Sequence, residues 1–534
     1  MLWSGWGDPA RATRLPESVR GLLGELLGGR LRDVPPASPA SPASLAEIAV
    51  PGSRLRDPAR AALAAVVGDR YVRADDESRI RHTAGKSTPD LLRIRRGEVT
   101  GAPDAVVLPG SPGDVLTVLR ICAEHRVAVV PFGGGTSVVG GLSAAAAPFT
   151  GLIALDLRRL DRVTEIDPVS RTATLEPGLR AARAEELLRA HGYTLGHFPQ
   201  SFEWATIGGF AAARSSGQAS AGYGRFDDMV VGLTVATPRG ALVLGRAPKS
   251  AAGPDLRQLV LGSEGALGVI TSVTVRLRPV PETTAYEGWR FPEFAAGTAA
   301  VRALAQDGPL PTVLRLSDET ETMAGLAKPG QIGSAQPAGC LVIAGYDGTA
   351  ADVADRQAKV HAVLGAAGGE FLGPEPGEEW ARGRYAAPYL RDALLDAGVF
   401  AETLETATFW SGLSGLYEAV RHALTTSLTD AGTPPLIMCH VSHVYPAGAA
   451  LYFTVVAADP GTAGWAAAKR AASDAILDAG GTISHHHGVG TDHRDWYATE
   501  IGPLGVEILR AVKDRLDPAG ILNPGVLIPH IPPE

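Results

Sequence analysis

The side chains most suited to chemistry in this sequence are three consecutive histidines, His485, His486 and His487. They follow Gly480-Gly481-Thr482-Ile483-Ser484 and precede Gly488-Val489-Gly490. Imidazole is the side chain whose ordinary pKa lies closest to neutral pH, and glycines let a ligand approach the backbone. The run therefore indicates proton transfer or anion binding. A solvated loop or an adventitious metal-binding run is the alternative that these residues alone leave open.

A second candidate site is a glycine-rich loop that follows a buried strand expected at residues 127–130. The loop reads Pro131-Phe132-Gly133-Gly134-Gly135-Thr136-Ser137. Consecutive glycines can adopt positive φ and turn successive amides toward one anion, while the two hydroxyls add donors. The loop matches neither the GxGxxG nor the GxxxxGK[ST] nucleotide motif. It therefore indicates a pyrophosphate cradle outside the commoner nucleotide folds, with a tight turn as the alternative.

Composition and charge limit the classes of protein to consider. The chain has 534 residues, which predicts two or three domains, and its 45% hydrophobic and 20% charged residues are typical of a folded soluble protein. The net charge of −8 argues against nucleic-acid binding. Cys122, Cys340 and Cys439 are far apart in sequence, so we expect buried thiols in a reducing compartment. Without a signal peptide or a long apolar run, we expect a cytoplasmic location.

The elements that must position these sites follow from local patterns. Apolar spacing predicts a helix over residues 16–30, followed by a Pro/Ala/Ser-rich tether at residues 35–44. A strand is expected at residues 105–108, followed by a helix that Asp114 can cap. A last helix is expected around residues 504–516, where Asp517-Pro518 ends it.

Two further glycine-rich tracts give the first loop a context. One runs from Gly196-His197-Phe198-Pro199-Gln200-Ser201 through Thr206-Ile207-Gly208-Gly209-Phe210 to Ser215-Ser216-Gly217, and the other spans residues 262–270. In this order and spacing, the three tracts resemble the flavin-binding half of the vanillyl-alcohol-oxidase superfamily, the PCMH-type FAD domain. The resemblance implies that the first loop holds the FAD diphosphate, the second lies along the isoalloxazine and ribityl chain, and the third closes over the adenine end.

Carried over to matching positions, the resemblance implies a set of cofactor-binding residues. These are Pro131, Gly133, Gly134, Gly135, Thr136, Ser137, Pro199, Ser201, Thr206, Gly208, Gly209, Ser216, Gly217, Glu264 and Ile270. Relatives that attach FAD covalently usually do so through His or Cys. The first loop contains neither, so we expect noncovalent FAD.

The rest of the chain resembles one family within that superfamily. The run from Ser484 to Gly490, the opening Trp3-Ser4-Gly5-Trp6-Gly7, Pro388-Tyr389-Leu390-Arg391-Asp392, Glu405-Thr406 and the segment 445–453 are similar to the alkyldihydroxyacetonephosphate synthase family. Membership implies non-redox ether-lipid synthesis. Acyl-dihydroxyacetone phosphate would lose a proton beside its ketone, form an adduct at flavin N5 and release a fatty acid, and a fatty alcohol would then add.

The same resemblance implies roles for individual residues. Tyr452, His486 and His487 are the candidate catalytic groups, with Tyr452 able to relay a proton if its pKa were lowered. Arg391 and His485 are the candidates for binding the substrate phosphate. The alternatives are a surface ion pair for Arg391 and a packed strand tyrosine for Tyr452. We expect no metal, although His440 and His443 could join the histidine run in a zinc-like cluster.

These inferences predict an α/β (α+β) protein with a PCMH-type FAD domain and an inserted antiparallel-sheet cap. The expected parts are an N-terminal helical segment at 1–98, the FAD domain at 99–281, the substrate-binding cap at 282–480 and a C-terminal segment at 481–534 that returns to the flavin. An apolar tunnel would hold the lipid tail. We also expect a homodimer and peripheral membrane association. The alternatives are an FAD-dependent 2-hydroxy-acid oxidase or dehydrogenase and a non-catalytic flavin-binding protein.

Overall fold

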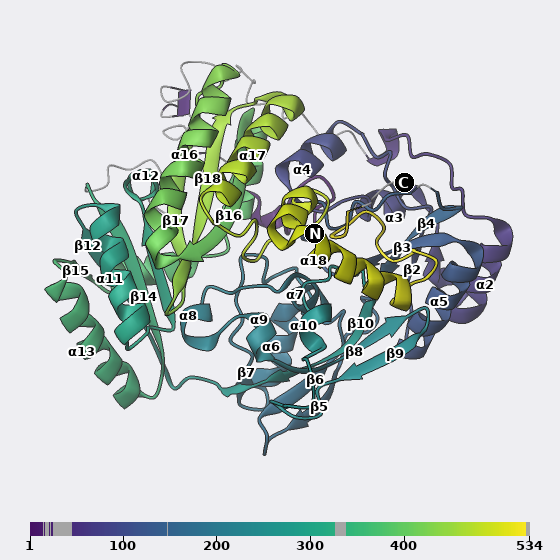
Figure 1. Cartoon of the computed structure of the whole chain (residues 1–534), viewed down its shortest axis with the longest axis horizontal. Helices are drawn as coiled ribbons and strands as arrows, with labels where there is room; N and C mark the ends of the chain where they lie inside the picture. The colour runs from purple at the N-terminus through teal and green to yellow at the C-terminus, as the bar shows by residue number, and fades with distance from the viewer. Residues whose placement is uncertain are drawn as a thin grey trace.

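The computed structural model describes residues 1–13, 15, 21, 23–24, 45–146, 148–325 and 338–529. Most of the helix expected at 16–30 and nearly all of the tether expected at 35–44 lie outside these residues. The described part contains three main sheets, with helices packed against them (Figure 1). The two smaller sheets form the flavin half, and the largest forms the substrate half.

The first flavin sheet has the strand order β1 (Val72–Arg73), β2 (Ala105–Val107), β4 (Gly151–Asp156) and β3 (Val127–Phe132). β2, β4 and β3 are parallel, as their almost wholly buried apolar runs predict, and β1 adds an antiparallel edge. Helices α5 (Pro112–His125) and α2 (Asp57–Val67) pack on this sheet. Residues of α2 and β1 share one hydrophobic core with β2.

The residue that caps the N-terminus of α5 is not the expected Asp114. Ser111 is its N-cap, because the Ser111 hydroxyl accepts a hydrogen bond from the Asp114 amide at 3.1 Å. Asp114 lies in the first turn, where its carboxylate accepts hydrogen bonds from the Gly110 amide and the Ser111 hydroxyl.

The second flavin sheet is antiparallel, in the order β5 (Val163–Asp167), β6 (Thr172–Leu175), β10 (Val269–Arg276), β8 (Val230–Thr237) and β9 (Gly240–Leu244). Helices α6 (Ala181–Arg189) and α7 (Ile207–Ala213) contribute to its core. The glycine-rich loop after β3 lies between this sheet and the first, which is where the FAD domain was expected to hold its cofactor.

The substrate half is a seven-stranded antiparallel sheet. Its order is β15 (Glu370–Gly373), β12 (Thr283–Phe291), β14 (Cys340–Gly348), β13 (Val313–Ser317), β17 (Leu436–Val444), β18 (Gly448–Ala458) and β16 (Val399–Phe409). One face packs against α11 (Phe294–Asp307), α13 (Ala350–Ala366), α16 (Leu413–Asp430) and α17 (Gly461–Asp478). Figure 1 shows α16 and α17 side by side over β16–β18. The opposite face of this sheet faces the candidate active site.

The C-terminal segment returns to the flavin half, as expected. The label α18 (Arg494–Leu516) covers two helical stretches, because the backbone of Gly502, with φ of 70° and ψ of 171°, is not helical. The second stretch, which begins at Pro503, is the helix expected around residues 504–516. After the helix, the Asn523 amide donates to the Val129 carbonyl of β3 at 2.8 Å. The histidine run precedes α18 in the chain. It lies between the two halves, because its backbone amides contact Glu405 of the substrate half and the amides that follow it contact Glu264 of the flavin half.

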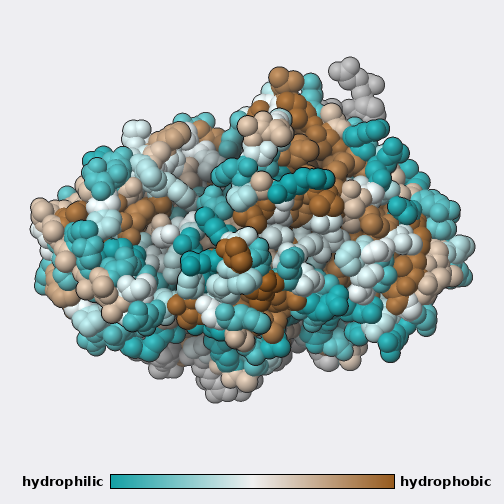
Figure 2. All heavy atoms as spheres, turned by 90° about the horizontal axis from the view of Figure 1, so that it is seen from below, coloured by the Kyte–Doolittle hydropathy of each residue, from teal (hydrophilic) through white to brown (hydrophobic). Residues whose placement is uncertain are grey.

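The remaining elements are short or peripheral. They are α3 (Asp76–Arg81), α4 (Thr88–Arg95), α8 (Ser220–Tyr223), α9 (Phe226–Met229), α10 (Arg257–Val260), α12 (Glu319–Ala324), α14 (Glu375–Gly383), α15 (Ala387–Asp396), a two-stranded pair of β7 (Tyr193–Thr194) and β11 (Arg278–Pro279), and four 3-10 turns at Pro9–Arg11, Leu45–Glu47, Asp69–Tyr71 and Trp410–Gly412. The three cysteines are buried free thiols, as expected. Hydrophobic patches alternate with hydrophilic ones on the face in Figure 2. Among the described helices, none has the length and apolarity needed to cross a bilayer.

Candidate active site

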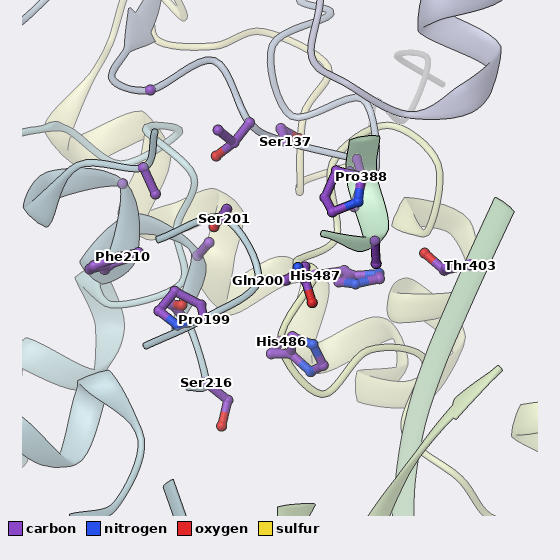
Figure 3. A pocket seen from close by; sticks show the side chains of 18 of the residues that line it. Ser137, Pro199, Gln200, Ser201, Phe210, Ser216, Pro388, Thr403, His486 and His487 are labelled. Carbon is purple, nitrogen blue, oxygen red and sulfur yellow. The ribbon is translucent and has the colours of Figure 1, made fainter. Parts of the chain in front are cut away.

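A cavity of about 510 Å³ lies between the flavin half and the free face of the substrate sheet. Its walls combine the loop after β3, the tract from Pro199 to Ser216, helix α15 and strands β16–β18. Figure 3 shows the labelled His486 and His487 on one side and Pro199, Ser201 and Ser216 on the other. The histidine run and the glycine-rich tracts, far apart in sequence, thus share one site.

The glycine-rich loop presents its amides as free donors. Within the described parts of the chain, the amides of residues 133–137 donate to no protein group. The loop also has no room for side chains: a Cβ at Gly134 would lie 2.3 Å from the Trp204 carbonyl oxygen, and Gly135 has φ of +69°. A row of unpaired amides facing a cavity suits an anionic group such as a diphosphate.

The other expected cofactor residues lie along the same cavity. Those that line it are Pro131, Gly133, Gly134, Gly135, Thr136, Ser137, Pro199, Ser201, Thr206, Gly208, Gly209, Ser216, Glu264 and Ile270. Gly217 does not line it, and its carbonyl instead accepts a hydrogen bond from His443 at 3.2 Å. The buried Ser216 Oγ and Gln200 Nε2 have no protein partner. Because buried polar groups are normally paired, these two atoms fit a polar cofactor ring.

Glu264 has a second role that the sequence did not indicate. Its carboxylate accepts hydrogen bonds from the amides of Val489 at 3.0 Å and Gly490 at 2.8 Å. Burial raises the pKa of this carboxyl to about 7, despite the two amide donors. Glu264 therefore fastens the end of the histidine loop to the flavin half.

The beginning of the histidine loop is held by Glu405 of β16. The Glu405 carboxylate accepts hydrogen bonds from the amides of His485 at 2.7 Å, His486 at 3.1 Å and His487 at 2.8 Å, and from the Ser484 hydroxyl at 2.7 Å. Burial alone would raise the pKa of Glu405, but the contact with the His486 ring outweighs burial and holds that pKa well below its usual range. An ionised carboxylate is thus the anchor of the loop.

The three histidines do not point the same way. His486 and His487 line the cavity, whereas His485 is not among the lining residues. The His485 ring lies between Tyr445, whose hydroxyl is 2.6 Å from Nε2, and His486, whose Nδ1 is 3.0 Å from its own Nδ1. His485 therefore lies behind the cavity wall, and its contact with the substrate phosphate stays a prediction.

Burial determines the protonation of these rings. It lowers the pKa of His487 to about 3 and that of His485 well below its ordinary value. Both are neutral imidazoles near pH 7, so each can accept a proton at one nitrogen while donating at the other.

Tyr452 lies on β18 opposite Glu405 of β16 and His440 of β17. Its ring packs edge-on to His487, with centroids 5.5 Å apart. Burial raises the pKa of Tyr452 to about 12. The lowered pKa that a proton-accepting tyrosinate would need is absent, and Tyr452 is a neutral hydroxyl that can donate a hydrogen bond.

Three arginines line the cavity, Arg315, Arg384 and Arg391, and the sequence indicated only Arg391. Arg391 of α15 donates to the Lys86 carbonyl at 2.6 Å and to Asp392 at 3.2 Å, while its buried Nε has no partner. Arg315 of β13, which sequence reasoning missed, is 3.0 Å from both Glu321 and His440. Nothing near Arg315 in the chain marks it, since only strand pairing brings it to His440.

The histidine cluster differs from the metal site considered as an alternative. Ring nitrogens of His443, His485 and His486 lie within 4.8 Å of one another, but His440 pairs instead with Glu321 at 3.0 Å. His443 Nδ1 is 2.9 Å from the Ser442 hydroxyl, and its Nε2 donates to the Gly217 carbonyl. With His485 also bonded through both nitrogens, protein partners already satisfy these rings.

Comparison with known proteins defines the class. Residues 103–244 match the family model described as "FAD binding domain", and residues 280–527 match "FAD linked oxidases, C-terminal domain". The solved structure of p-cresol methylhydroxylase, at 19% identity and a TM-score of 0.68 over 89% of this chain and 97% of its own, shares the fold. The chain is thus an FAD-dependent enzyme with the FAD-linked oxidase fold, and its PCMH-type architecture with an antiparallel cap is confirmed.

Closer relatives define the family. Alkyldihydroxyacetonephosphate synthase of Dictyostelium discoideum is 34% identical, covering 86% of this chain and 79% of its own length. The protein of the same name from Trypanosoma brucei brucei is 32% identical, covering 100% and 93%. A solved alkyldihydroxyacetonephosphate synthase structure is 30% identical over 98% of both chains, with a TM-score of 0.83. The chain belongs to the alkyldihydroxyacetonephosphate synthase family.

Proposed function

We propose that this enzyme exchanges the acyl chain of acyl-dihydroxyacetone phosphate for a fatty alcohol, which forms an ether lipid without net redox change. The observation that carries the proposal is one cavity, lined by the glycine-rich loop, by apolar side chains, by three arginines and by four histidines that include His486 and His487. Bound FAD would supply an electron-poor ring that accepts the substrate carbon during the exchange. The residues of the chain must then hold the phosphate, move protons and bury the tail.

The substrate sheet grades from polar to apolar along its free face. The row nearest the histidine loop holds Glu405, Tyr452 and His440, the next holds Thr403, Thr454 and Met438, and the third holds Ala401, Val456 and Leu436. Rows two residues apart are about 7 Å apart. Leu390 and Leu394 of α15 also line the cavity. We therefore place the polar head of the substrate near Tyr452 and its tail along Ala401, Met438 and Val456.

Enlarging Val456 should shorten the preferred chain. In Val456→Phe the added ring fills the apolar end of the channel, and each methylene that no longer fits loses about 0.8 kcal/mol of burial. We expect activity on the longest accepted alcohol to fall roughly tenfold relative to one two carbons shorter. Competition between alcohols of different length measures this ratio. An unchanged length profile, with folding intact, would place the tail elsewhere.

For the phosphate, we propose Arg391 as the binding residue, with Arg315 as a second cation. Arg391→Lys keeps the charge but removes the planar donor fork and its unpaired Nε. We expect the KM for the phosphorylated substrate to rise about tenfold, since charge-assisted hydrogen bonds contribute about 1.5–3 kcal/mol. Arg382→Lys, at an exposed α14 position outside the cavity wall, is the matched control. Equal KM values in both variants would rule out Arg391 as the phosphate ligand.

The reaction itself is tested by following both flavin and product. Under anaerobic conditions, incubation with acyl-dihydroxyacetone phosphate and a labelled fatty alcohol should give labelled ether lipid while the flavin stays oxidised. A 2-hydroxy-acid dehydrogenase would instead bleach its flavin with a hydroxy acid and form no ether. A non-catalytic flavin-binding protein would do neither.

Three further properties belong to the same proposal. We propose noncovalent FAD, because the diphosphate loop contains no His or Cys, and acid precipitation should leave the yellow colour in solution. Peripheral membrane binding fits a lipid substrate and the exposed Leu504 and Ile508, one turn apart on α18, and vesicle flotation tests it. We also propose a homodimer, which light scattering would measure.

A further inference from the structure

A line of hydrogen bonds leads from the cavity toward the surface. It begins at His486, passes to His485 over 3.0 Å between their Nδ1 atoms, and reaches the Tyr445 hydroxyl over 2.6 Å. Arg225 interacts with the Tyr445 hydroxyl and pairs with Asp227 at 3.1 Å. The side chains of Arg225 and Asp227 are 18% and 13% exposed, and the exposed Pro446 follows Tyr445.

The proposed reaction, on which this inference rests, releases a proton inside the cavity. The bond from the substrate carbon to the acyl oxygen breaks, and the acyloxy group leaves with the electron pair as a carboxylate. A bond from the same carbon to the alcohol oxygen forms, and the alcohol loses its hydroxyl proton. Ester and alcohol thus give ether, carboxylate and one proton, with nothing oxidised or reduced. That proton must leave a largely enclosed, apolar site.

The line contains the groups that such a transfer requires. Burial keeps His485 neutral, so its ring accepts at one nitrogen and donates at the other. A tyrosine hydroxyl also accepts and donates at the same atom, and its contact with His485 is short. Each member can therefore pass a proton on without keeping a charge in the interior, where an unpaired charge is costly.

We propose that His486, His485 and Tyr445 form the path by which the proton leaves the active site, and that the half-buried Tyr445 passes it to solvent. Arg225 stays protonated and so does not carry the proton; paired with Asp227, it holds the Tyr445 hydroxyl in place. His485 and Tyr445 act through His486 and do not touch the substrate. This assignment explains why His485 turns away from the cavity while its two neighbours face it.

Tyr445→Phe breaks the path and keeps the ring. We expect kcat for ether formation to fall about tenfold, while KM and FAD content stay the same. This is less than the roughly 10²–10⁴-fold typical of a lost general acid or base, because His486 and His487 remain in place. The solvent isotope effect on kcat should rise, and added imidazole, a small proton carrier, should restore much of the rate. The control is Tyr417→Phe, which removes a tyrosine hydroxyl that donates to Asp318 at 3.0 Å outside the cavity wall.

The outcomes separate the path from the reaction. If the wild type forms ether and Tyr445→Phe has the same kcat, the proposed path is overturned and the proposed function stands. A slow variant that imidazole does not rescue, with no change in isotope effect, would make Tyr445 merely structural and would also overturn the path. Wild-type protein that forms no ether and releases no proton to a pH indicator would overturn both.

Discussion

Glu405→Ala is expected to abolish most of the activity while leaving FAD bound. The substitution leaves four buried donors without an acceptor, the amides of residues 485–487 and the Ser484 hydroxyl. Each unpaired donor costs about 1–3 kcal/mol, so the loop should move until these groups find water. His486 and His487 would then leave the cavity wall, and we expect kcat to fall about 10³-fold, within the range for lost general acid–base catalysis.

Product formation, flavin absorbance and thermal unfolding together check this expectation. Glu405→Gln should be intermediate, because one amide oxygen can keep the donors at Oε1 while its NH₂ group meets the His485 amide. The matched control is Glu287→Ala, which removes another buried carboxylate of the same sheet, one that accepts from Tyr346 and Trp289 at 2.7 and 3.0 Å. It should lose stability with little change in kcat. Equal losses of kcat in both variants would show that Glu405 only stabilises the fold.

Tyr452→Phe is expected to have the second largest effect. The substitution retains the packing of the ring against His487 and removes only the hydroxyl. Since burial raises the pKa of Tyr452 to about 12, the wild-type hydroxyl stays protonated across the working pH range and can donate to the reacting substrate. We expect kcat to fall about 10²-fold or more, with no change in the acidic limb of the pH profile.

Tyr346→Phe is the matched control for Tyr452, because it removes a buried tyrosine hydroxyl that donates to Glu287 at 2.7 Å outside the cavity wall. Both variants should keep their flavin spectra. Activity of Tyr452→Phe within twofold of wild type would show that the hydroxyl takes no part. If the pH profile of wild-type kcat had a limb near neutrality that Tyr452→Phe lacked, Tyr452 would instead act as a tyrosinate.

The FAD cofactor, and the glycine-rich stretches that line the cavity, could be predicted from the sequence. The loop from Pro131 to Ser137 and the tract from Pro199 to Ser216 are continuous stretches whose glycines and small residues restrict the local backbone. Such stretches favour a cradle because turn geometry and free amides depend on neighbouring residues, and the three tracts together decided against a simple tight turn. The antiparallel substrate-binding cap was predicted from the family resemblance instead of from local backbone preferences.

The reacting side of the cavity depended on pairing between distant strands. Register between β16 and β18 places Glu405 beside Tyr452, and register between β17 and β13 brings Arg315 to His440. A shift of one residue would turn each of these side chains to the helix-covered face. No local pattern near Glu405 or Arg315 reveals that choice.

The histidine run shows the division most clearly. By itself, the sequence determined that three imidazoles stand between glycines in a family that needs proton transfer. Only the tertiary structure decided that His486 and His487 face the cavity while His485 faces Tyr445. The physical reason is that residue type sets what a side chain can do, whereas two carboxylates from different halves, the buried Glu405 and the half-buried Glu264, set where the loop points.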